Sequence, residues 1–224
     1  MKSKKHFKLS LFLLAAAFLI VAIALIFMPE KVPVHYNIRG HIDRYGSKFE
    51  FLILPALGAL LWLIFHLLAK KSFKENEANR SHLYLASAYL LFVFIVLEII
   101  FIILAFNHSE NIPSEDIIYK TINVILGLFC IVIGNIMPKM TRNKVMGLRT
   151  TWSLYNDNTW NKSQRYGGFA FVGTGFIIIV ASIFVPGIYN LLVLFLTLMF
   201  GLVLSIILSY KVYKEEKAKE KTTS

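Results

Sequence analysis

The side chains most able to do chemistry are concentrated in one segment, 29–48. Within nine residues it carries His35, Asn37, His41 and Asp43. Imidazole and carboxylate groups are ligands that zinc prefers, so a metal site is one hypothesis, but the spacing matches no standard zinc signature and offers no fourth ligand. The alternative is a folded turn, in which Asn and Asp side chains bond backbone amides and Gly40 and Gly46 adopt positive φ. We favour a polar pocket without a metal.

A second segment of unusual composition, 138–166, combines tryptophan with basic side chains. Its candidate binding residues are Asn143, Gly147, Arg149, Thr150, Trp152, Trp160 and Arg165. Tryptophan prefers the membrane interface because its ring is apolar and its N–H is polar. Asn156 or Asp157 could cap a short helix that Gly167 and Gly168 would end. The segment is either a docking surface for a cytoplasmic partner or a connector anchored at the membrane.

One carboxylate stands inside an apolar run. Glu98 lies eight residues before the end of the run 83–106. Antiparallel packing of the next run would bring it to the depth of Asn123, with Lys120 about one turn further out. A proton or ligand site is one interpretation. We favour a structural hydrogen bond with Asn123 or Lys120, because polar pairs inside membranes often serve helix packing.

Six apolar runs must position these side chains. They span 11–28, 51–69, 83–106, 117–137, 169–185 and 191–210. A hydrocarbon core of about 30 Å needs about 20 helical residues, and backbone groups in lipid must pair within their own segment. With 57% hydrophobic residues, the sequence predicts an all-α integral membrane protein with six transmembrane helices.

The distribution of charge predicts the topology. Of 24 Lys and Arg residues, 19 lie at the N-terminus, in 70–82, in 138–166 or after 210. Cytoplasmic segments carry such an excess, so we expect both termini inside and the segment 29–50 outside. The net charge of +11 is then explained by topology and anionic lipid, without direct nucleic-acid binding. The first run is expected to be an uncleaved anchor.

Motifs of known enzyme classes are missing from the sequence. It contains no His-Glu-x-x-His, no Gly-x-Ser-x-Gly, no Walker loop and only one cysteine, Cys130. We therefore expect no enzyme activity, no cofactor and no disulfide within the chain.

The two unusual segments resemble known families. The pattern Pro33-x-His35-x-Asn37-x-x-Gly40-x-x-Asp43, with Gly46 and Lys48, resembles a widespread bacterial membrane domain of unknown function. The pattern Asn143-x-x-x-Gly147-x-Arg149-Thr150-x-Trp152, with Trp160, Arg165 and Gly167–Gly168, is similar to the C-terminal signature of the SdpI family. Thr151 stands where many relatives carry proline. The resemblance implies two modules, a two-helix module at 1–69 and a four-helix module at 70–224.

The resemblance to the SdpI family implies immunity to a secreted, membrane-active peptide toxin, exercised from the bacterial plasma membrane. It also implies a receptor role, in which the toxin-bound protein holds a small transcriptional repressor at the membrane. The external residues expected to bind toxin are His35, Asn37, Gly40, Asp43 and Lys48, and the candidates in 138–166 would bind the repressor. Two alternatives stay open, a small proton-linked transporter or exporter that uses Glu98 and a membrane metallo-hydrolase that uses the external His and Asp residues.

Overall fold

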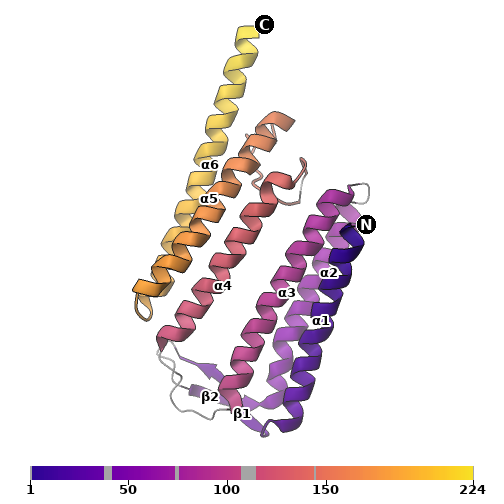
Figure 1. Ribbon diagram of the computed structural model, residues 1–224, viewed down its shortest axis with the longest axis vertical. Helices are drawn as coiled ribbons and strands as arrows, with labels where there is room; N and C mark the ends of the chain where they lie inside the picture. The colour runs from indigo at the N-terminus through magenta and orange to yellow at the C-terminus, as the bar shows by residue number, and fades with distance from the viewer. Residues whose placement is uncertain (1, 38–41, 74–75, 107–114, 144, 224) are drawn as a thin grey trace. The chain divides into compact units, whose positions relative to one another are not determined.

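Six helices dominate the structure, a computed structural model that describes residues 2–37, 42–73, 76–106, 115–143 and 145–223 (Figure 1). Their bounds are α1 (Lys2–Phe27), α2 (Ile53–Ser72), α3 (Glu77–Phe106), α4 (Glu115–Ile136), α5 (Asp157–Phe184) and α6 (Tyr189–Thr223). Each corresponds to one predicted run and is long and apolar enough to cross a membrane. The predicted class, an all-α membrane protein with six spans, is confirmed; the side on which the termini lie stays a prediction.

The chain forms two compact units, Met1–Ile118 and Tyr119–Ser224. The first holds α1, α2 and α3, and the second holds most of α4 together with α5 and α6. The boundary between the compact units thus follows Ile118 in the sequence, whereas the boundary between the modules implied by the family resemblance follows residue 69. That module boundary stays a prediction.

In the first unit, α1 packs against α3 through small side chains. Ser3, Ser10, Ala17 and Ala24 are spaced by seven residues and all are buried, so they form one stripe along α1. Small residues let helix backbones approach closely where no hydrophobic effect drives their association. At the start of both helices, the Arg80 Nε donates to Ser3 Oγ at 3.1 Å. At their far ends, Val21 and Met28 share a buried cluster with Ile102.

A β-hairpin covers that far end of the first unit. Strands β1 (Lys31–Tyr36) and β2 (Ile42–Ser47) pair antiparallel, and the 3₁₀ helix η1 (Lys48–Leu52) leads from them into α2. Val32 of β1 is fully buried in the same cluster as Val21, Met28 and Ile102. The expected positive φ at Gly46 is wrong, because Gly46 lies within β2 and pairs with Val32. Gly40 and His41 lie outside the described residues.

In the second unit, α5 and α6 form an antiparallel hairpin, and glycines join α4 to α5 (Figure 1). A Cβ added to Gly134 would stand 2.6 Å from the Gly168 carbonyl oxygen, so the two backbones are in direct contact. The helix break predicted at Gly167–Gly168 is therefore wrong: both are buried within a continuous α5. Glycine serves here for close approach of backbones rather than for a turn.

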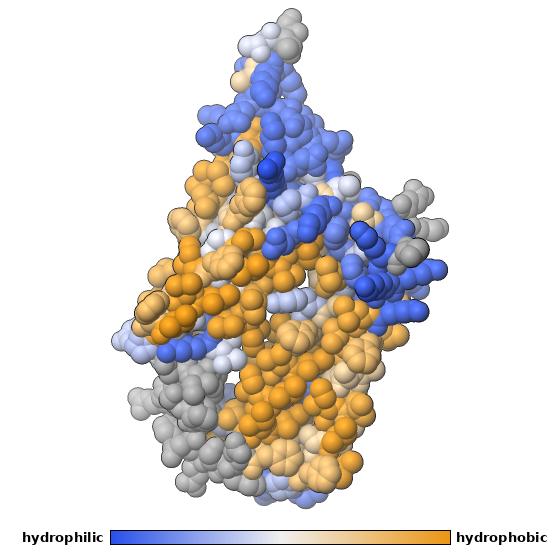
Figure 2. Space-filling view, in the orientation of Figure 1, coloured by the Kyte–Doolittle hydropathy of each residue, from blue (hydrophilic) through white to orange (hydrophobic). Residues whose placement is uncertain are grey.

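The polar tail of the chain continues α6. The helix runs past the apolar stretch to Thr223, and hydrophilic side chains cover its end while hydrophobic ones cover the span (Figure 2). The 3₁₀ helix η2 (Met137–Lys139) ends α4 and opens the long segment that precedes α5.

Candidate binding surfaces

The hairpin brings together two of the predicted external residues. His35 Nδ1 lies 2.6 Å from Asp43 Oδ1, and their side chains are 62% and 41% exposed. The pair therefore stands on the surface, where a ligand can reach both groups. Asn37 is also exposed at the end of β1. Among the described residues, no set of three His, Cys, Asp or Glu side chains is placed to hold a metal ion.

Lys48, also predicted to bind a ligand, lies at the base of the hairpin. Its side chain is only 15% exposed, and Nζ lies 2.9 Å from Glu30 Oε1 and 3.5 Å from the Met28 carbonyl oxygen. The backbone N–H of Lys48 also donates to the Glu30 carbonyl at 3.2 Å. These bonds tie the two ends of the hairpin together, so Lys48 supports its shape.

Two features of the hairpin escaped the sequence analysis. Arg44 donates through both terminal nitrogens to Glu50, at 3.3 and 2.9 Å, which fixes β2 against η1. Tyr45 and Phe49 expose their rings nearby. Tyr36, by contrast, is partly buried, and this burial raises the pKa of its phenol above the usual tyrosine value. The exposed surface thus combines a polar pair with aromatic rings.

In the second unit, Asn143 folds the segment after η2. Its Oδ1 accepts from the N–H groups of Val145 and Met146, both at 2.8 Å, and its Nδ2 donates to the Thr141 carbonyl at 2.9 Å. An Asn side chain that bonds backbone a few residues on mimics a turn. The motif residue Asn143 therefore acts inside its own loop.

Gly147 and Gln164 fix the next part of the loop. Gly147 has a φ of 97°, a conformation that glycine adopts without steric cost. Gln164, fully buried on α5, accepts from the Leu148 N–H and donates to the Leu148 carbonyl, both at 2.9 Å. A Cβ on Gly147 would lie 2.5 Å from Gln164 Oε1, so the motif glycine also makes room for this amide. Sequence reasoning missed Gln164, because a polar residue in a basic segment suggests an exposed one.

Trp160 anchors the other side of the loop. Its ring is fully buried, and Nε1 donates to the Met140 carbonyl at 2.7 Å. One turn earlier, Asn156 caps α5 and forms a capping box with Thr159, as the sequence predicted for Asn156. Trp160 thus holds η2 against α5 and lies inside the fold rather than at its surface.

Hydroxyl groups connect the loop to α6. Thr150 Oγ1 lies 3.2 Å from Ser209 Oγ, which lies 3.0 Å from Ser163 Oγ. The Ser153 side chain donates to the Leu148 carbonyl at 2.7 Å and accepts from the Thr150 N–H at 2.9 Å. The predicted partner residue Thr150 is thereby engaged within the second unit.

The exposed side chains of the motif are those of the two arginines. Arg149 projects from the loop, and Arg165 is exposed on α5 with its guanidinium 5.9 Å from the centre of the Phe169 ring. Trp152 is half-buried, with its ring edge-on to Tyr210 at 5.0 Å. Of the seven predicted residues in 138–166, these three are therefore the ones best able to touch another molecule.

The tail of α6 is attached to the same loop. Tyr155 donates to Glu220 at 2.8 Å, and Asn158 donates to Glu216 at 2.6 Å. The hydrogen bond to the Glu220 carboxylate raises the pKa of the Tyr155 phenol above its usual value. Glu216 and Glu220 of the tail thus point toward the loop.

The polar residues within the spans separate into the two units. Asn123 of α4 is fully buried and donates to the Asn190 carbonyl at 3.1 Å and to its Oδ1 at 3.2 Å. Glu98 is buried on α3, and neither of its oxygens has a hydrogen-bond partner among the described residues. Pairing of Glu98 with Asn123 or Lys120 would join the two units and stays a prediction.

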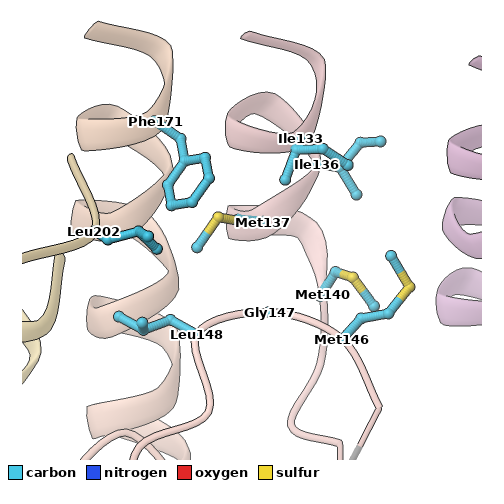
Figure 3. A pocket seen from close by; sticks show the side chains of 9 residues that line it. All are labelled: Ile133, Ile136, Met137, Met140, Met146, Gly147, Leu148, Phe171 and Leu202. Atoms are coloured by element: carbon cyan, nitrogen blue, oxygen red, sulfur yellow. The ribbon is translucent and has the colours of Figure 1, made fainter. Parts of the chain in front are cut away.

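An apolar cavity of about 180 Å³ lies under the loop of the second unit (Figure 3). Ile133 and Ile136 of α4, Phe171 of α5 and Leu202 of α6 line it, and Met137, Met140, Met146, Gly147 and Leu148 cover it. No polar side chain is among these lining residues.

Comparisons with known proteins identify relatives of the chain. Residues 139–210 match the SdpI/YfhL protein family, and residues 12–59 match a domain of unknown function, DUF1648. The chain is 29% identical over 207 residues to the "Immunity protein SdpI" of Bacillus subtilis strain 168. The aligned region covers 92% of this chain and 95% of that protein. An "Uncharacterized protein" of Archaeoglobus fulgidus is 41% identical over 46 residues, 20% of this chain and 25% of that protein. No solved structure matches the chain.

The two matched regions contain the two surfaces described above. The hairpin lies in the region 12–59, and the loop with its anchors Trp160, Gln164 and Ser209 lies in the region 139–210. With the six apolar helices, this similarity identifies a multi-pass protein of the bacterial plasma membrane. The near full-length similarity and the two matched regions support membership of the chain in the SdpI/YfhL family.

Proposed function

We propose that this protein protects the cell that carries it against a secreted, membrane-active peptide toxin. The observation that carries the proposal is the similarity to a protein named for immunity, which extends over 92% of this chain. Because the similarity extends over nearly the whole of both chains and not over one motif alone, it supports a function shared by the whole protein.

The toxin meets the protein at the hairpin. The excess of basic residues in the other polar segments supports an external position for 29–50. There, the exposed His35–Asp43 pair offers polar contacts, and the exposed Tyr45 and Phe49 rings offer apolar ones. A membrane-active peptide has polar and apolar faces, and a surface with both kinds of group suits it. Lys48 maintains the hairpin from below.

A repressor docks, in this proposal, on the cytoplasmic loop of the second unit. Arg149, Arg165 and the exposed edge of Trp152 form its contact surface, since arginine and tryptophan dominate binding energy in many protein interfaces. Asn143, Gly147, Thr150 and Trp160 act behind this surface, because their groups bond within the loop or are buried.

Survival of exposed cells tests the immunity proposal. The chain is expressed in a B. subtilis strain that lacks its own immunity protein, and the cells meet culture fluid from toxin-producing B. subtilis or from the strain that carries this chain. We expect survival in at least one fluid, and Asp43→Asn or His35→Ala should abolish it. Lys31→Gln, at an exposed position at the start of β1, serves as the matched control on the same hairpin. Survival no better than with empty vector in both fluids, at normal membrane levels of protein, refutes the proposal.

Membrane recruitment of the repressor tests the second surface separately. Arg149→Gln with Arg165→Gln should release the repressor from the membrane and leave survival unchanged, because neither substitution removes a hydrogen bond of the loop. If variants that insert normally always lose both activities together, the two surfaces are not separate sites.

A second candidate function, a small proton-linked transporter, is favoured by one observation. Glu98 is a buried carboxyl in a span without a hydrogen-bond partner among the described residues, and such groups often mark proton pathways. Removal of the peptide from cells that stops when the proton gradient is collapsed would support this function over immunity by binding.

A further inference from the structure

We propose that the cavity under the loop of the second unit binds one acyl chain of an anionic phospholipid, with the headgroup held by Lys139 and Arg149. The inference concerns a ligand site in the family's own region and does not depend on toxin immunity.

The size and lining of the cavity suit a hydrocarbon chain. Its volume of about 180 Å³ exceeds that of an engineered apolar cavity of roughly 150 Å³ that stays dry and binds benzene. Every lining side chain is apolar, so water inside would find no side-chain hydrogen-bond partner there. Three of them are methionines, Met137, Met140 and Met146, whose flexible thioethers adapt to irregular ligands (Figure 3).

The loop that covers the cavity is held in place by many specific bonds. Met140 is fixed by the Trp160 indole, Leu148 by both groups of the Gln164 amide, and Met146 by the Asn143 side chain. A loop free to collapse would close an unoccupied apolar void, because its lining atoms gain contacts by doing so. These bonds instead hold the covering residues in place, which preserves the space.

Basic side chains lie next to the covering residues. Lys139 precedes Met140 and Arg149 follows Leu148 in the chain, and both are exposed. Arg142 is held by Asp157 at 2.8 Å, whereas no ion pair is recorded for Lys139 or Arg149 among the described residues. The cavity walls belong to spans and these cations to the segment where the spans end, so a ligand that fills both places has an apolar chain and an anionic headgroup. A phospholipid of the bilayer has that chemistry and is present at that depth.

Quenching of tryptophan fluorescence by brominated lipid tests the proposal on the full-length protein. Trp62→Phe with Trp152→Phe leaves Trp160, which bonds the cavity residue Met140, as the only reporter. In detergent micelles, phosphatidylglycerol with brominated chains should quench it. Unbrominated phosphatidylglycerol should reverse the quenching at a concentration at least tenfold lower than phosphatidylcholine does. Equal competition by the two lipids overturns the anionic site.

Substitutions separate the chain from the headgroup. Ile133→Phe fills the cavity and should reduce quenching by at least half, while Leu196→Phe, exposed on α6 away from the cavity, should not. Lys139→Gln with Arg149→Gln should make the two unbrominated lipids reverse the quenching at nearly equal concentrations. Lys211→Gln should leave the advantage of phosphatidylglycerol unchanged. Wild-type quenching in Ile133→Phe overturns the proposal.

A second measurement covers the case in which Ile133→Phe fails to fold. Native mass spectrometry of the unaltered protein should show retained phosphatidylglycerol after detergent exchange, in preference to phosphatidylcholine added in equal amount. Loss of both lipids on exchange overturns the proposal independently of any variant.

Discussion

The contact between α4 and α5 is the part of the fold most sensitive to a single methyl group. Gly134 and Gly168 face each other backbone to backbone, and a Cβ on either would stand 2.6 Å from the carbonyl oxygen of the other. An ordinary contact begins near 3.4 Å, so the two backbones must separate by roughly 0.8 Å locally. The neighbouring atom is backbone and cannot rotate away. Overpacking of this kind costs about 1–3 kcal/mol.

Gly173 provides a matched control on the same helix. A Cβ there would meet nothing within 4 Å, so Gly173→Ala should be neutral or stabilise α5 by about 1 kcal/mol through helix propensity. Gly168→Ala gains the same propensity, so the overpacking cost sets the difference between the two variants, and for a chain of this size about 2 kcal/mol corresponds to a difference in Tm of roughly 5 °C. We therefore expect Gly168→Ala to lower the Tm of the purified protein in detergent and Gly173→Ala to maintain or raise it. Equal Tm values for the two variants would refute the close backbone contact.

Three further predictions concern topology, the buried carboxyl and the tail. In a cysteine-free background, cysteine at Ser47 should react with an impermeant thiol reagent on intact cells, and cysteine at Asn161 only after permeabilisation; the reverse pattern contradicts the proposed orientation. Glu98→Gln should insert, fold and protect as the wild type does, because the amide has nearly the size of the carboxyl and adds no charge to the buried site; loss of protection at an unchanged membrane level would identify a proton site instead. The Tyr155 phenol has a raised pKa, so its bond to Glu220 stabilises the docked tail below the usual tyrosine range and is lost as pH rises through the raised pKa. An ultraviolet titration should show late-titrating phenols, with one fewer of them in Tyr155→Phe than in the wild type, and an unchanged late phase in that variant would contradict the docked tail.

The spans could be predicted from the sequence because length and apolar composition decide them almost alone. Six runs near 20 residues leave the backbone few alternatives in lipid. The cap at Asn156 was predictable for a similar reason, since its side chain bonds a backbone N–H three residues away. Such local signals lie within one turn and need no knowledge of the packing.

Packing of distant segments explains what the sequence did not predict. Gly167 and Gly168 were expected to end a helix, and only the approach of Gly134 makes them part of one. Gln164 gave no signal, because its partner Leu148 lies 16 residues away in an irregular loop. The His35–Asp43 pair was correctly placed in one cluster, but its position on paired strands depends on burial of Val32 against the helices.

The structure divides the family's C-terminal motif into residues that build the loop and residues that face solvent. Asn143, Gly147 and Trp160 each satisfy a need internal to the loop: a turn, a positive φ and a bond to the Met140 carbonyl. Similarity at such positions reports that the loop is built in the same way and carries no information about what it touches. Loss of activity in a Trp160 variant would therefore be explained by loss of the loop. Arg149 and Arg165 are different, because their replacement leaves every recorded hydrogen bond of the loop in place. A partner of this surface is consequently identified through the two arginines, and a change in partner between relatives should appear at these positions before it appears at the tryptophan.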